Sequence, residues 1–442
     1  MEVDSAEYAI RPQELIVHDY HYPNMNSAGT VEDKIRTAKT ECKQLYDQIN
    51  RIKGKIQDTQ LMNLSHGVNS LHEFNLQPVR TLKGHNNKIS DVKWSQDSAS
   101  VLSSSQDGFI IIWDPFTGLK KSAIPLLSQW VLSSAISPSG NLVASAGLDN
   151  HCSVYRVSRD NRIQQNVISI FKGHTCYISA TEFLDERTIL TASGDMTCAM
   201  WDIPKSKRVT EFIDHLGDVL TMDLPPANTG RYGHNFITGG SDGYAYLWDV
   251  RQPNSAQSFF ISDSDVSAIK FFNNGESFMA GSDDGSARLF DLRSDCQIST
   301  YSFSDGLLQQ HQLQQQQHHH HHHHHPPHPH AYSRIQKNRY GSSSSSTSSY
   351  PIVKTPQSLN FKESCIEDQG VISIDFSSSG RLMYACYADY GCAVWDIIKG
   401  EMIGKVDGHR NRINAVKTSP DGMAVVSSSW DMTLKVWTPV HP

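Results

Sequence analysis

Short apolar segments alternate with polar residues along most of the chain, and tight turns separate them. In SVLSSSQDGFIIIWD (residues 100–114), residues of high β-propensity flank Asp107-Gly108, and Asp-Gly recurs at 242–243 and 284–285. Asp-Gly between two strands predicts a type I′ hairpin turn, in which both central residues have positive φ. Segments such as KISDVKW and LVASAG mix alternation with short apolar runs, as expected for sheets covered on both faces. The pattern predicts an all-β fold.

Each repeat is marked by an aspartate with an aromatic residue six positions later. Successive aspartates lie 42, 46, 47, 42, 105 and 42 residues apart. All but one of these intervals match the ~40–45-residue period of four-stranded propeller blades, and the exception exceeds one repeat by about 63 residues. We therefore expect seven blades, with an insertion between the fifth and the sixth. The seven copies are Asp107/Trp113, Asp149/Tyr155, Asp195/Trp201, Asp242/Trp248, Asp284/Phe290, Asp389/Trp395 and Asp431/Trp437.

Three copies contain a His, a Ser, an Asp and a Trp that are suited to a buried polar network. The Trp N–H can donate to the Ser hydroxyl, the Ser to the His ring, and the His to the carboxylate, which satisfies every buried polar group. The other four copies are incomplete; Gly147, Gly240 and Tyr387, for example, stand where the Ser is expected. The predicted networks are His85/Ser105/Asp107/Trp113, His174/Ser193/Asp195/Trp201 and His409/Ser429/Asp431/Trp437.

Ser, His and Asp are also the residue types of hydrolase triads, so an enzyme is one alternative. A hydrolase needs one exposed nucleophile with an oxyanion hole, whereas this set repeats around a ring and no G-x-S-x-G elbow is present. No phosphate-binding G-x-x-x-x-G-K-[ST] motif occurs either. We therefore expect no catalytic residue, no enzyme activity and no cofactor. A Ser105→Ala variant separates the two interpretations, since catalysis predicts lost turnover and architecture predicts lost stability.

Residues 31–59 carry apolar side chains in a helical pattern. Their spacing of 4, 3, 4, 3, 4, 3 and 4 residues is typical of one strand of a coiled coil. Thr30 with Asp33 approximates a capping box at the start. A lone helix of this length is marginal in water, so we expect a partner helix; homodimerisation and packing against the side of the propeller are the alternatives. The seam consists of Val31, Ile35, Ala38, Cys42, Leu45, Ile49, Ile52 and Ile56.

The composition narrows the classes of partner. Lys plus Arg number 39 against 46 Asp plus Glu, and the net charge of −7 disfavours binding to nucleic acid. The eight cysteines include no C-x-x-C pair, which predicts reduced thiols in an intracellular protein. The sequence has no apolar signal segment, no stretch of 18 apolar residues and no lipidation motif. We therefore expect the protein to reach a membrane only through its partners.

The long interval between the fifth and sixth repeats has a composition of its own. It contains LLQQHQLQQQQHHHHHHHHPPHPH and GSSSSSTSS. Such polar tracts cannot bury enough apolar surface to fold, which predicts a disordered surface loop. The histidines at 318–325 are a candidate Zn²⁺ or Ni²⁺ site, but a flexible run fixes no coordination geometry, and we expect no metal. Thr355, which precedes a proline, is a candidate phosphorylation site, as is the serine run.

The runs LKGH…SQDGFIIIWD, FKGH…SGDMTCAMWD and VDGH…SSWDMTLKVW resemble the WD40 repeat family. The resemblance implies a seven-bladed WD40 β-propeller that is closed by a strand from the N-terminal side, for which residues 78–83 are available. Closure removes exposed sheet edges. The expected organisation is a disordered tail (1–29), a coiled-coil helix (30–60), a connecting segment (61–77), the closing strand with blades one to five (78–304), the insertion (305–365), and blades six and seven (366–442).

A single coiled-coil strand directly before such a ring resembles the β subunits of heterotrimeric G proteins, over about residues 30–304 and 366–440. SQWVLSSAISPSGNLVASAGLDN and GSDDGSARLFDLRSD are more specific than a generic repeat, and LKGHNNKISD and WDIPKSKRV are similar to fungal subunits of the mating-pheromone pathway. The resemblance implies a γ subunit bound constitutively to the helix and a GDP-bound α subunit bound reversibly to the narrow face. It also implies scaffold or kinase effectors of a MAP-kinase cascade, and a peripheral location at the cytoplasmic face of the plasma membrane through lipidated partners.

The resemblance also assigns surface residues by position. Exposed aromatic residues usually dominate interfaces, so Trp130 and Trp430 are the expected anchors, and the aspartates would attract a basic partner. Ser90, Leu132 and Leu220 differ from the residues common in the family. The N-terminal helix of the α subunit is expected near Asn86, Phe109, Ile111 and Lys120. The expected α and effector face comprises Lys88, Trp130, Leu132, Leu148, Asn150, Tyr177, Asp218, Leu220, Asp265, Asp283 and Trp430.

A generic WD40 scaffold or adaptor that is not coupled to a G protein is the other alternative. No degradation-module motif precedes the repeats, and the single heptad seam favours a G-protein partner. Co-purification with a small prenylated helical protein distinguishes the two.

Overall fold

The computed structural model describes residues 31–56, 61–71, 74–157, 166–226, 233–309 and 369–439. They fall into two compact units, Met1–Asp58 and Thr59–Pro442. The first unit contributes one helix, α1 (Val31–Ile56), within the segment that the heptad pattern predicted to be helical. The predicted N-terminal tail, residues 1–29, lies outside the described residues, as do the histidine run and Thr355 of the insertion.

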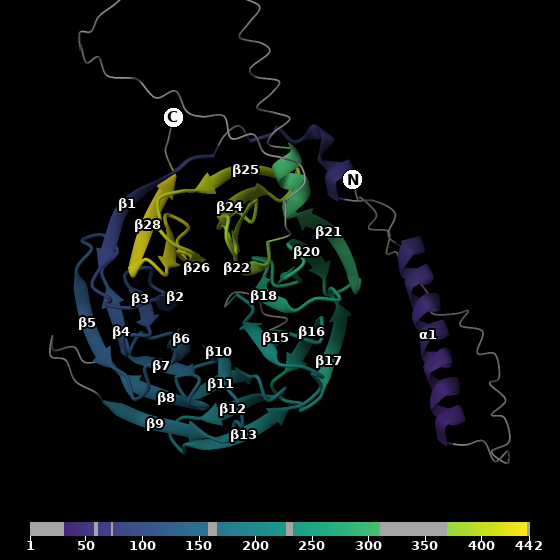
Figure 1. Ribbon diagram of the computed structural model, residues 1–442, viewed down its shortest axis with the longest axis horizontal. Helices are drawn as coiled ribbons and strands as arrows, with labels where there is room; N and C mark the ends of the chain where they lie inside the picture. The colour runs from purple at the N-terminus through teal and green to yellow at the C-terminus, as the bar shows by residue number, and fades with distance from the viewer. Residues whose placement is uncertain are drawn as a thin grey trace, which may run out of the picture. The chain divides into compact units, whose positions relative to one another are not determined.

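Seven four-stranded antiparallel sheets, counted over the described part of the second unit, are arranged around a central axis (Figure 1). This confirms the predicted all-β propeller. Each of the first six sheets uses four strands consecutive in sequence, and the chain moves from the axis to the rim. The first four blades are β2 (Ile89–Trp94), β3 (Val101–Ser105), β4 (Phe109–Trp113) and β5 (Lys120–Pro125); β6 (Val131–Ile136), β7 (Leu142–Gly147), β8 (His151–Arg156) and β9 (Val167–Lys172); β10 (Ile178–Phe183), β11 (Thr188–Ser193), β12 (Cys198–Asp202) and β13 (Lys207–Phe212); and β14 (Val219–Asp223), β15 (Asn235–Gly240), β16 (Tyr244–Asp249) and β17 (Ser255–Phe260).

The seventh blade joins the two ends of the propeller. Its outer strand comes from the N-terminal side and pairs antiparallel with the last strand of the chain, with Thr81 opposite Lys435. The closing strand expected at residues 78–83 is thus part of this sheet. The last three blades are β18 (Val266–Phe271), β19 (Ser277–Ser282), β20 (Ser286–Asp291) and β21 (Cys296–Ser302); β22 (Val371–Phe376), β23 (Leu382–Tyr387), β24 (Gly391–Asp396) and β25 (Glu401–Val406); and β26 (Ile413–Thr418), β27 (Val425–Ser429), β28 (Thr433–Pro439) and β1 (Leu76–Lys83).

The hydrophobic core is divided into clusters that lie between neighbouring blades. One cluster, for example, joins Trp113 of the first blade to Leu434 of the seventh, and another joins Tyr387 of the sixth to Tyr301 of the fifth. Middle strands such as β3 and β7 are buried along their whole length, because both faces of a blade are covered by its neighbours. The apolar runs in the sequence therefore reflect burial on two faces.

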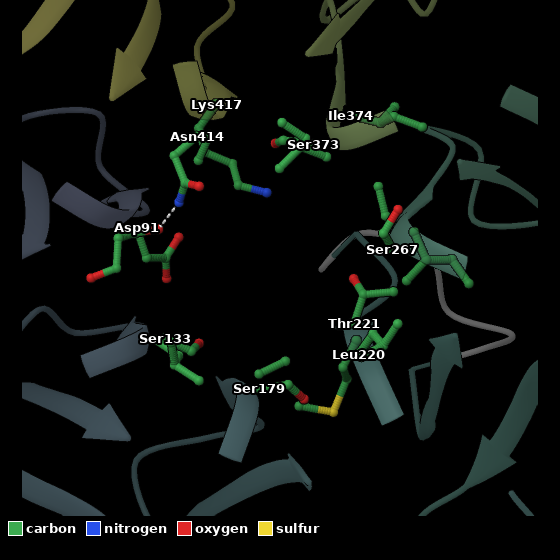
Figure 2. Close-up of a pocket in the computed structure, with 18 of the residues that line it drawn as sticks. Asp91, Ser133, Ser179, Leu220, Thr221, Ser267, Ser373, Ile374, Asn414 and Lys417 are labelled. Carbon is green, nitrogen blue, oxygen red and sulfur yellow. Dashed lines mark hydrogen bonds between the residues drawn. The ribbon is translucent and has the colours of Figure 1, made fainter. Parts of the chain in front are cut away.

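The innermost strands surround an axial cavity of about 170 Å³ (Figure 2). Lys93 of β2 pairs with Glu182 of β10, and Lys270 of β18 pairs with Asp223 of β14 at 2.8 Å. Backbone N–H groups of following blades donate to inner-strand carboxylates; the N–H of Phe271, for instance, donates to Asp223 over 2.8 Å. Because partly buried charges need partners, these contacts link the inner strands of different blades around the axis.

The Asp-Gly turns differ from the predicted type I′ geometry. Ser105 pairs with Phe109, so the β3–β4 loop contains three residues, and the Gly108 N–H donates to the Ser105 carbonyl over 3.1 Å. Among the residues of this loop only Gly108 has positive φ, at 82°. A type I turn followed by one left-handed residue fits these values. The prediction was wrong because Asp-Gly occurs both in the two-residue loops of type I′ hairpins and in three-residue loops such as this one.

Two segments outside the blades pack on the propeller. In the expected connecting segment, α2 (Leu61–Leu64) leads into the 3₁₀ turn η1 (Ser65–Gly67), and Lys399 of the sixth blade donates to the Ser65 carbonyl over 2.8 Å. Residues 303–309 are helical. Phe303 is buried and Gly306 lies against Trp395, so the ordered chain extends to residue 309, whereas the sequence predicted a disordered insertion from residue 305.

Candidate protein-interaction site

A buried polar network spans the first blade, but one of its members differs from the prediction. Trp113 Nε1 donates to the Ser103 hydroxyl over 2.8 Å, this hydroxyl meets His85 Nε2 at 2.8 Å, and His85 Nδ1 meets the Asp107 carboxylate at 2.9 Å. The predicted hydroxyl, Ser105, was wrong. It bonds to the Asn87 carbonyl at 3.1 Å and accepts the N–H of Asp107 at 3.2 Å. Both serines lie on one face of β3 because side chains alternate along a strand.

The network of the third blade needs the same correction. Trp201 Nε1 donates to the Thr191 hydroxyl over 2.8 Å, and His174 Nε2 meets that hydroxyl at 2.8 Å. The predicted partner of Trp201 and His174, Ser193, was wrong, because the Ser193 hydroxyl donates to the Tyr177 carbonyl over 2.9 Å instead. Trp201 itself is 3% exposed, so its indole is a core side chain of the blade.

The network of the seventh blade is corrected in the same way. Trp437 Nε1 donates to the Ser427 hydroxyl over 2.8 Å, and His409 Nε2 meets that hydroxyl at 2.7 Å. The predicted partner of Trp437 and His409, Ser429, was wrong; its hydroxyl donates to the Asn411 carbonyl over 3.1 Å. Trp437 is fully buried. In these blades the network hydroxyl lies ten residues before the Trp, and the residue two positions later bonds a loop backbone.

The fourth blade contains a complete network that the sequence analysis missed. His215 meets Thr238 at 2.8 Å and Asp242 at 3.0 Å, and Trp248 Nε1 donates to the Thr238 hydroxyl over 2.8 Å. Gly240, which was read as the missing Ser, occupies the turn-side position. The ten-residue spacing from Thr238 to Trp248 was the available signal.

The aspartates of these four networks lie in the loops between the second and third strands of their blades, and each holds the loop that leads in from the preceding blade and contains the His. Each accepts the His ring and also the backbone N–H of the residue after that His. Burial raises the pKa of these carboxyls, but the hydrogen bonds lower it more, so the pKa of Asp107, Asp195, Asp242 and Asp431 lies below its ordinary value. The donating N–H groups belong to Asn86, Thr175, Leu216 and Arg410, at 2.8, 3.0, 2.9 and 3.0 Å.

These networks do not form an active site. The four His side chains are at most 2% exposed, and the hydroxyls that they contact are fully buried. A nucleophile must reach its substrate, and a buried hydroxyl with bonded neighbours on every side cannot. The networks therefore fix the loops that connect neighbouring blades and those that join second and third strands.

Those loops place the predicted α-face residues at the same end of the propeller. Trp430 follows β27 and is partly exposed. Lys88 Nζ lies 3.8 Å from the centroid of its ring, and the Arg412 guanidinium lies 5.1 Å from it. Two cations near one indole hold it in place by cation–π attraction. The sequence analysis did not identify Arg412.

Trp130 and Leu148 form the most exposed apolar pair of the predicted face. Trp130 is 59% exposed and Leu148 is 52% exposed. The Leu148 N–H donates to the Trp130 carbonyl over 3.0 Å, and a Cβ on Gly147 would lie 1.9 Å from that oxygen. Both exposed side chains are therefore carried by a closely fitted backbone. Asn150 continues the same rim by donating to the Thr175 carbonyl over 3.3 Å.

Acidic residues occupy the rim of the fourth and fifth blades. The Tyr177 hydroxyl donates to Asp218 over 2.8 Å, and the Asp283 N–H donates to the Asp265 carbonyl over 3.0 Å. Partial burial, together with the carboxylates of Asp283 and Asp218, raises the pKa of Asp265 above its ordinary value. These three carboxylates thus lie close enough to repel one another, which favours a cationic partner group.

Two further predicted residues, Leu132 and Leu220, lie at the inner edge of this face and line the axial cavity. Leu220 is labelled in Figure 2. Ile213 and Leu216, in the β13–β14 loop, are 61% and 82% exposed and were missed. The signal was two apolar residues in FIDHLGD, a segment where turn residues are normally polar.

The expected second contact, on the side of the first blade, is only partly accessible. Asn86 and Lys120 are exposed, and Phe109 is 36% exposed. Ile111 is 3% exposed and packs between the first and seventh blades. Its assignment to a surface was wrong, because β4 is buried on both faces beyond Phe109.

The predicted seam follows one side of α1. Ile35 and Leu45 are 50% and 52% exposed, and Ala38 and Cys42 are exposed as well. The side chains of Val31, Ile49, Ile52 and Ile56 lie outside the described residues. A 26-residue helix is about 39 Å long, so the seam would offer a partner helix a continuous contact.

Metal-binding clusters and membrane-spanning helices are absent from the part of the chain that the structure describes. These residues contain no group of three or more His, Cys, Asp or Glu side chains that could hold a metal ion. Their helices include none with the length and hydropathy needed to cross a bilayer.

Comparison with known proteins gives extensive matches. A model of the family described as "G protein beta WD-40 repeat protein" matches residues 32–310, and "WD domain, G-beta repeat" matches residues 361–396 and 400–438. "Guanine nucleotide-binding protein subunit beta" of Saccharomyces cerevisiae is 51% identical over 443 residues, which cover 99% of this chain and 98% of the relative. "Guanine nucleotide-binding protein subunit beta-5b" of Danio rerio is 35% identical over 409 residues, covering 92% and 87%.

Proposed function

The chain belongs to the G protein β WD-40 repeat family, whose members are non-catalytic signalling subunits, and from this premise we propose how it serves as the β subunit of a heterotrimeric G protein. It holds a γ subunit through α1 and binds a GDP-bound α subunit reversibly through the loop rim. A role in a fungal pheromone response is proposed from the similarity of LKGHNNKISD and WDIPKSKRV to fungal subunits of that pathway.

The observation that carries the α-subunit proposal is the exposed Trp130–Leu148 pair. The backbone that carries this pair is so closely fitted that it has no space for a side chain at position 147. Large aromatic side chains contribute most of the binding energy in protein interfaces when they are fixed before binding. Trp430, held by Lys88 and Arg412, is a second such anchor. The acidic residues Asp265 and Asp283 complete the face, since they would attract a basic surface of the α subunit.

The γ subunit is proposed to cover the seam of α1. Each large apolar side chain that becomes fully buried is worth about 1.5–3 kcal/mol, so Ile35 and Leu45 would contribute to the association together with the rest of the seam. A lipid on the γ subunit would bring the protein to the cytoplasmic face of the plasma membrane as a peripheral component.

Signalling then follows from competition for one surface. While the α subunit holds GDP it covers the rim, and after nucleotide exchange it leaves. Scaffold or kinase effectors of a MAP-kinase cascade then use overlapping residues, with Trp130 and Trp430 serving both kinds of partner. No movement of the propeller is needed, because a rigid rim presents the same residues to each partner in turn.

The α-subunit proposal is tested by measuring binding of the full chain to a GDP-loaded α subunit. Trp130→Ala and Trp430→Ala should each weaken binding by about tenfold or more, since removing an aromatic anchor usually costs at least about 2 kcal/mol. Val209→Ala is the matched control, because Val209 is 55% exposed but lies on the outer strand β13. Equal affinities for all three variants would show that the rim is not the α-binding face.

The γ-subunit proposal is tested separately by co-purification. Ile35→Asp and Leu45→Asp place a charge on the seam and should abolish recovery of the γ subunit. Lys43→Asp, at an exposed position outside the seam, should leave recovery unchanged. If the seam variants retain the γ subunit, α1 binds something else.

A further inference from the structure

The outer strands β1 and β5 follow each other on the rim of the ring (Figure 1), and three exposed apolar side chains lie on β1 and in the loop that precedes β5. Phe116 and Leu119, in the loop, are 70% and 68% exposed, and Val79, on β1, is 46% exposed. Arg80 of β1 connects the strand to this loop, because its Nε donates to the Phe116 carbonyl over 3.0 Å and its Nη1 to the Val79 carbonyl over 2.9 Å. These residues therefore form one continuous surface, here called the closing-strand patch.

Five cations lie on β1, on β5 and on β28, which pairs with β1. Their nitrogens bond to neutral oxygens: Lys120 donates to the Gly84 carbonyl over 3.1 Å, and Lys435 lies 3.4 Å from the Thr81 hydroxyl. Among the described residues, no carboxylate lies within 4.0 Å of any of the five, so their charge is not neutralised locally. The five cations are Arg80, Lys83, Lys120, Lys121 and Lys435.

Two carboxylates that feel the charge of Lys121 are already engaged. Hydrogen bonds from their own loops lower the pKa of Asp97 and Asp114, and the charge of Lys121 adds to this effect. Asp114, for example, accepts the N–H groups of Phe116 and Thr117 at 2.9 and 3.1 Å. Since no described carboxylate pairs with the five cations, the patch is positive in a chain whose net charge is −7.

A second basic segment, on β13, shows what distinguishes the closing-strand patch. Lys205 pairs with Asp202 at 3.2 Å, and Arg208 pairs with Glu211 at 2.6 Å. The only large apolar side chain exposed on that strand is Val209. A surface with paired charges and little apolar area is typical of an ordinary solvated strand.

We propose that the closing-strand patch binds the surface of a membrane rich in anionic phospholipids. Unpaired cations around exposed Phe and Leu are the combination that inserts into the interface of a negatively charged leaflet. The patch lies on the convex outer rim, which suits a flat and adaptable lipid surface. Of the five cations only Lys120 is shared with the proposed contact of the α subunit's N-terminal helix. The membrane contact would act as the second of two signals, since a single lipid chain on a partner anchors only weakly.

The test measures binding of the full-length chain, produced in a host that adds no lipid, to phosphatidylcholine vesicles with and without phosphatidylserine. Binding should require phosphatidylserine and weaken with added salt. The triple variant Arg80→Gln/Lys83→Gln/Lys435→Gln should bind on the order of 100-fold more weakly, from about fivefold per charge. Phe116→Ser with Leu119→Ser should reduce binding by about tenfold or more. Lys120 is left unchanged, because it also belongs to the proposed α-helix contact.

A matched triple variant controls for net charge. Lys205→Gln/Lys207→Gln/Arg208→Gln removes the same three charges from β13 and should change vesicle binding by less than about twofold. Melting temperatures of all variants verify folding, since the substituted side chains lie on the surface. Equal loss in both triple variants would reduce the effect to net charge and overturn the proposal. So would binding that does not depend on phosphatidylserine. Absence of binding to either kind of vesicle would also overturn it, and is the result expected if the patch serves an acidic protein instead of a lipid surface.

Discussion

The difference between Ser103 and Ser105 gives the sharpest test of how the blades are held together. Both serines are fully buried on the same strand, and Ser→Ala removes the same atom from each. Ser103→Ala leaves the Trp113 N–H and His85 Nε2 without partners inside the blade. Each unsatisfied buried group costs about 1–3 kcal/mol, so the expected loss is about 2–4 kcal/mol. Ser105→Ala should cost only about 1 kcal/mol, because its partners, the Asn87 carbonyl and the Asp107 N–H, belong to exposed or partly exposed loop residues that can bond to water.

Thermal unfolding of the full chain, followed by tryptophan fluorescence, measures the difference. Unfolding entropy is about 2.1 cal/mol/K per residue, so 1 kcal/mol corresponds to roughly 1 °C in a propeller of this size. We expect Tm to fall by about 3–5 °C for Ser103→Ala and by about 1 °C for Ser105→Ala. In a Trp113→Phe background the cost of Ser103→Ala should drop by at least about 1 kcal/mol, because the donor is gone. If Ser105→Ala is the more damaging change, the hydroxyl has been assigned to the wrong serine.

Three further predictions follow from individual contacts. In Gly147→Ala the new Cβ would overlap the Trp130 carbonyl and displace the Trp130 loop. The free energy of unfolding should fall by about 1–3 kcal/mol, and the affinity for the α subunit should fall with it; calorimetry measures both. Burial lowers the pKa of His409 in the folded protein, so folding favours the neutral imidazole. The free energy of unfolding should therefore be highest above about pH 6.5 and should decrease as the pH falls from that value towards the folded-state pKa. In His409→Asn the slope of Tm against pH should flatten. Asp223→Asn keeps the side-chain volume but removes the ion pair with Lys270. The free energy of unfolding in urea should fall by about 2 kcal/mol. This is less than for a fully buried pair, because the Lys270 side chain is 26% exposed.

The fold was predictable from the sequence because its signals are periodic. The aspartate-to-aromatic spacing is fixed by a short hairpin that hardly varies, so seven blades could be counted. Ser103 and Ser105 could not be separated by the same reasoning, since side chains two residues apart lie on one face of a strand. What distinguishes them is the reach of the Trp113 ring: Trp113 lies opposite Val101, and its Nε1 extends towards the turn as far as Ser103 but not to the turn-side Ser105. The rings of Trp201 and Trp437 reach Thr191 and Ser427 in the same way.

His215 was missed for a different reason. In the fourth blade the His and the Asp are separated by 27 residues, against 21 or 22 in the other three networks. The extra residues lie in the surface connection between β14 and β15, which can lengthen without disturbing the blade. A search for a fixed His-to-Asp spacing therefore fails wherever this loop grows, whereas the hydroxyl-to-Trp spacing across the hairpin stays at ten residues.

The proposed contact residues depend on three-dimensional packing that the sequence does not express directly. The family resemblance placed Ile111 in a surface contact, yet the seventh blade covers it. Leu216 was not predicted, and it is among the most exposed apolar side chains described. Exposure at a rim is set by how neighbouring loops fold over one another, and no local period encodes it.

The buried networks and the exposed rim are physically linked, which has a consequence for binding. In the third blade Asp195 accepts both the His174 ring and the Thr175 N–H, so one carboxylate fixes the loop that leads to Tyr177. Substituting the buried Thr191 should therefore loosen this loop even though Thr191 touches no partner. Any loss of α-subunit affinity in Thr191→Val should arise from disorder of the loop before binding. Faster hydrogen exchange of residues 173–177 in the free protein would accompany it.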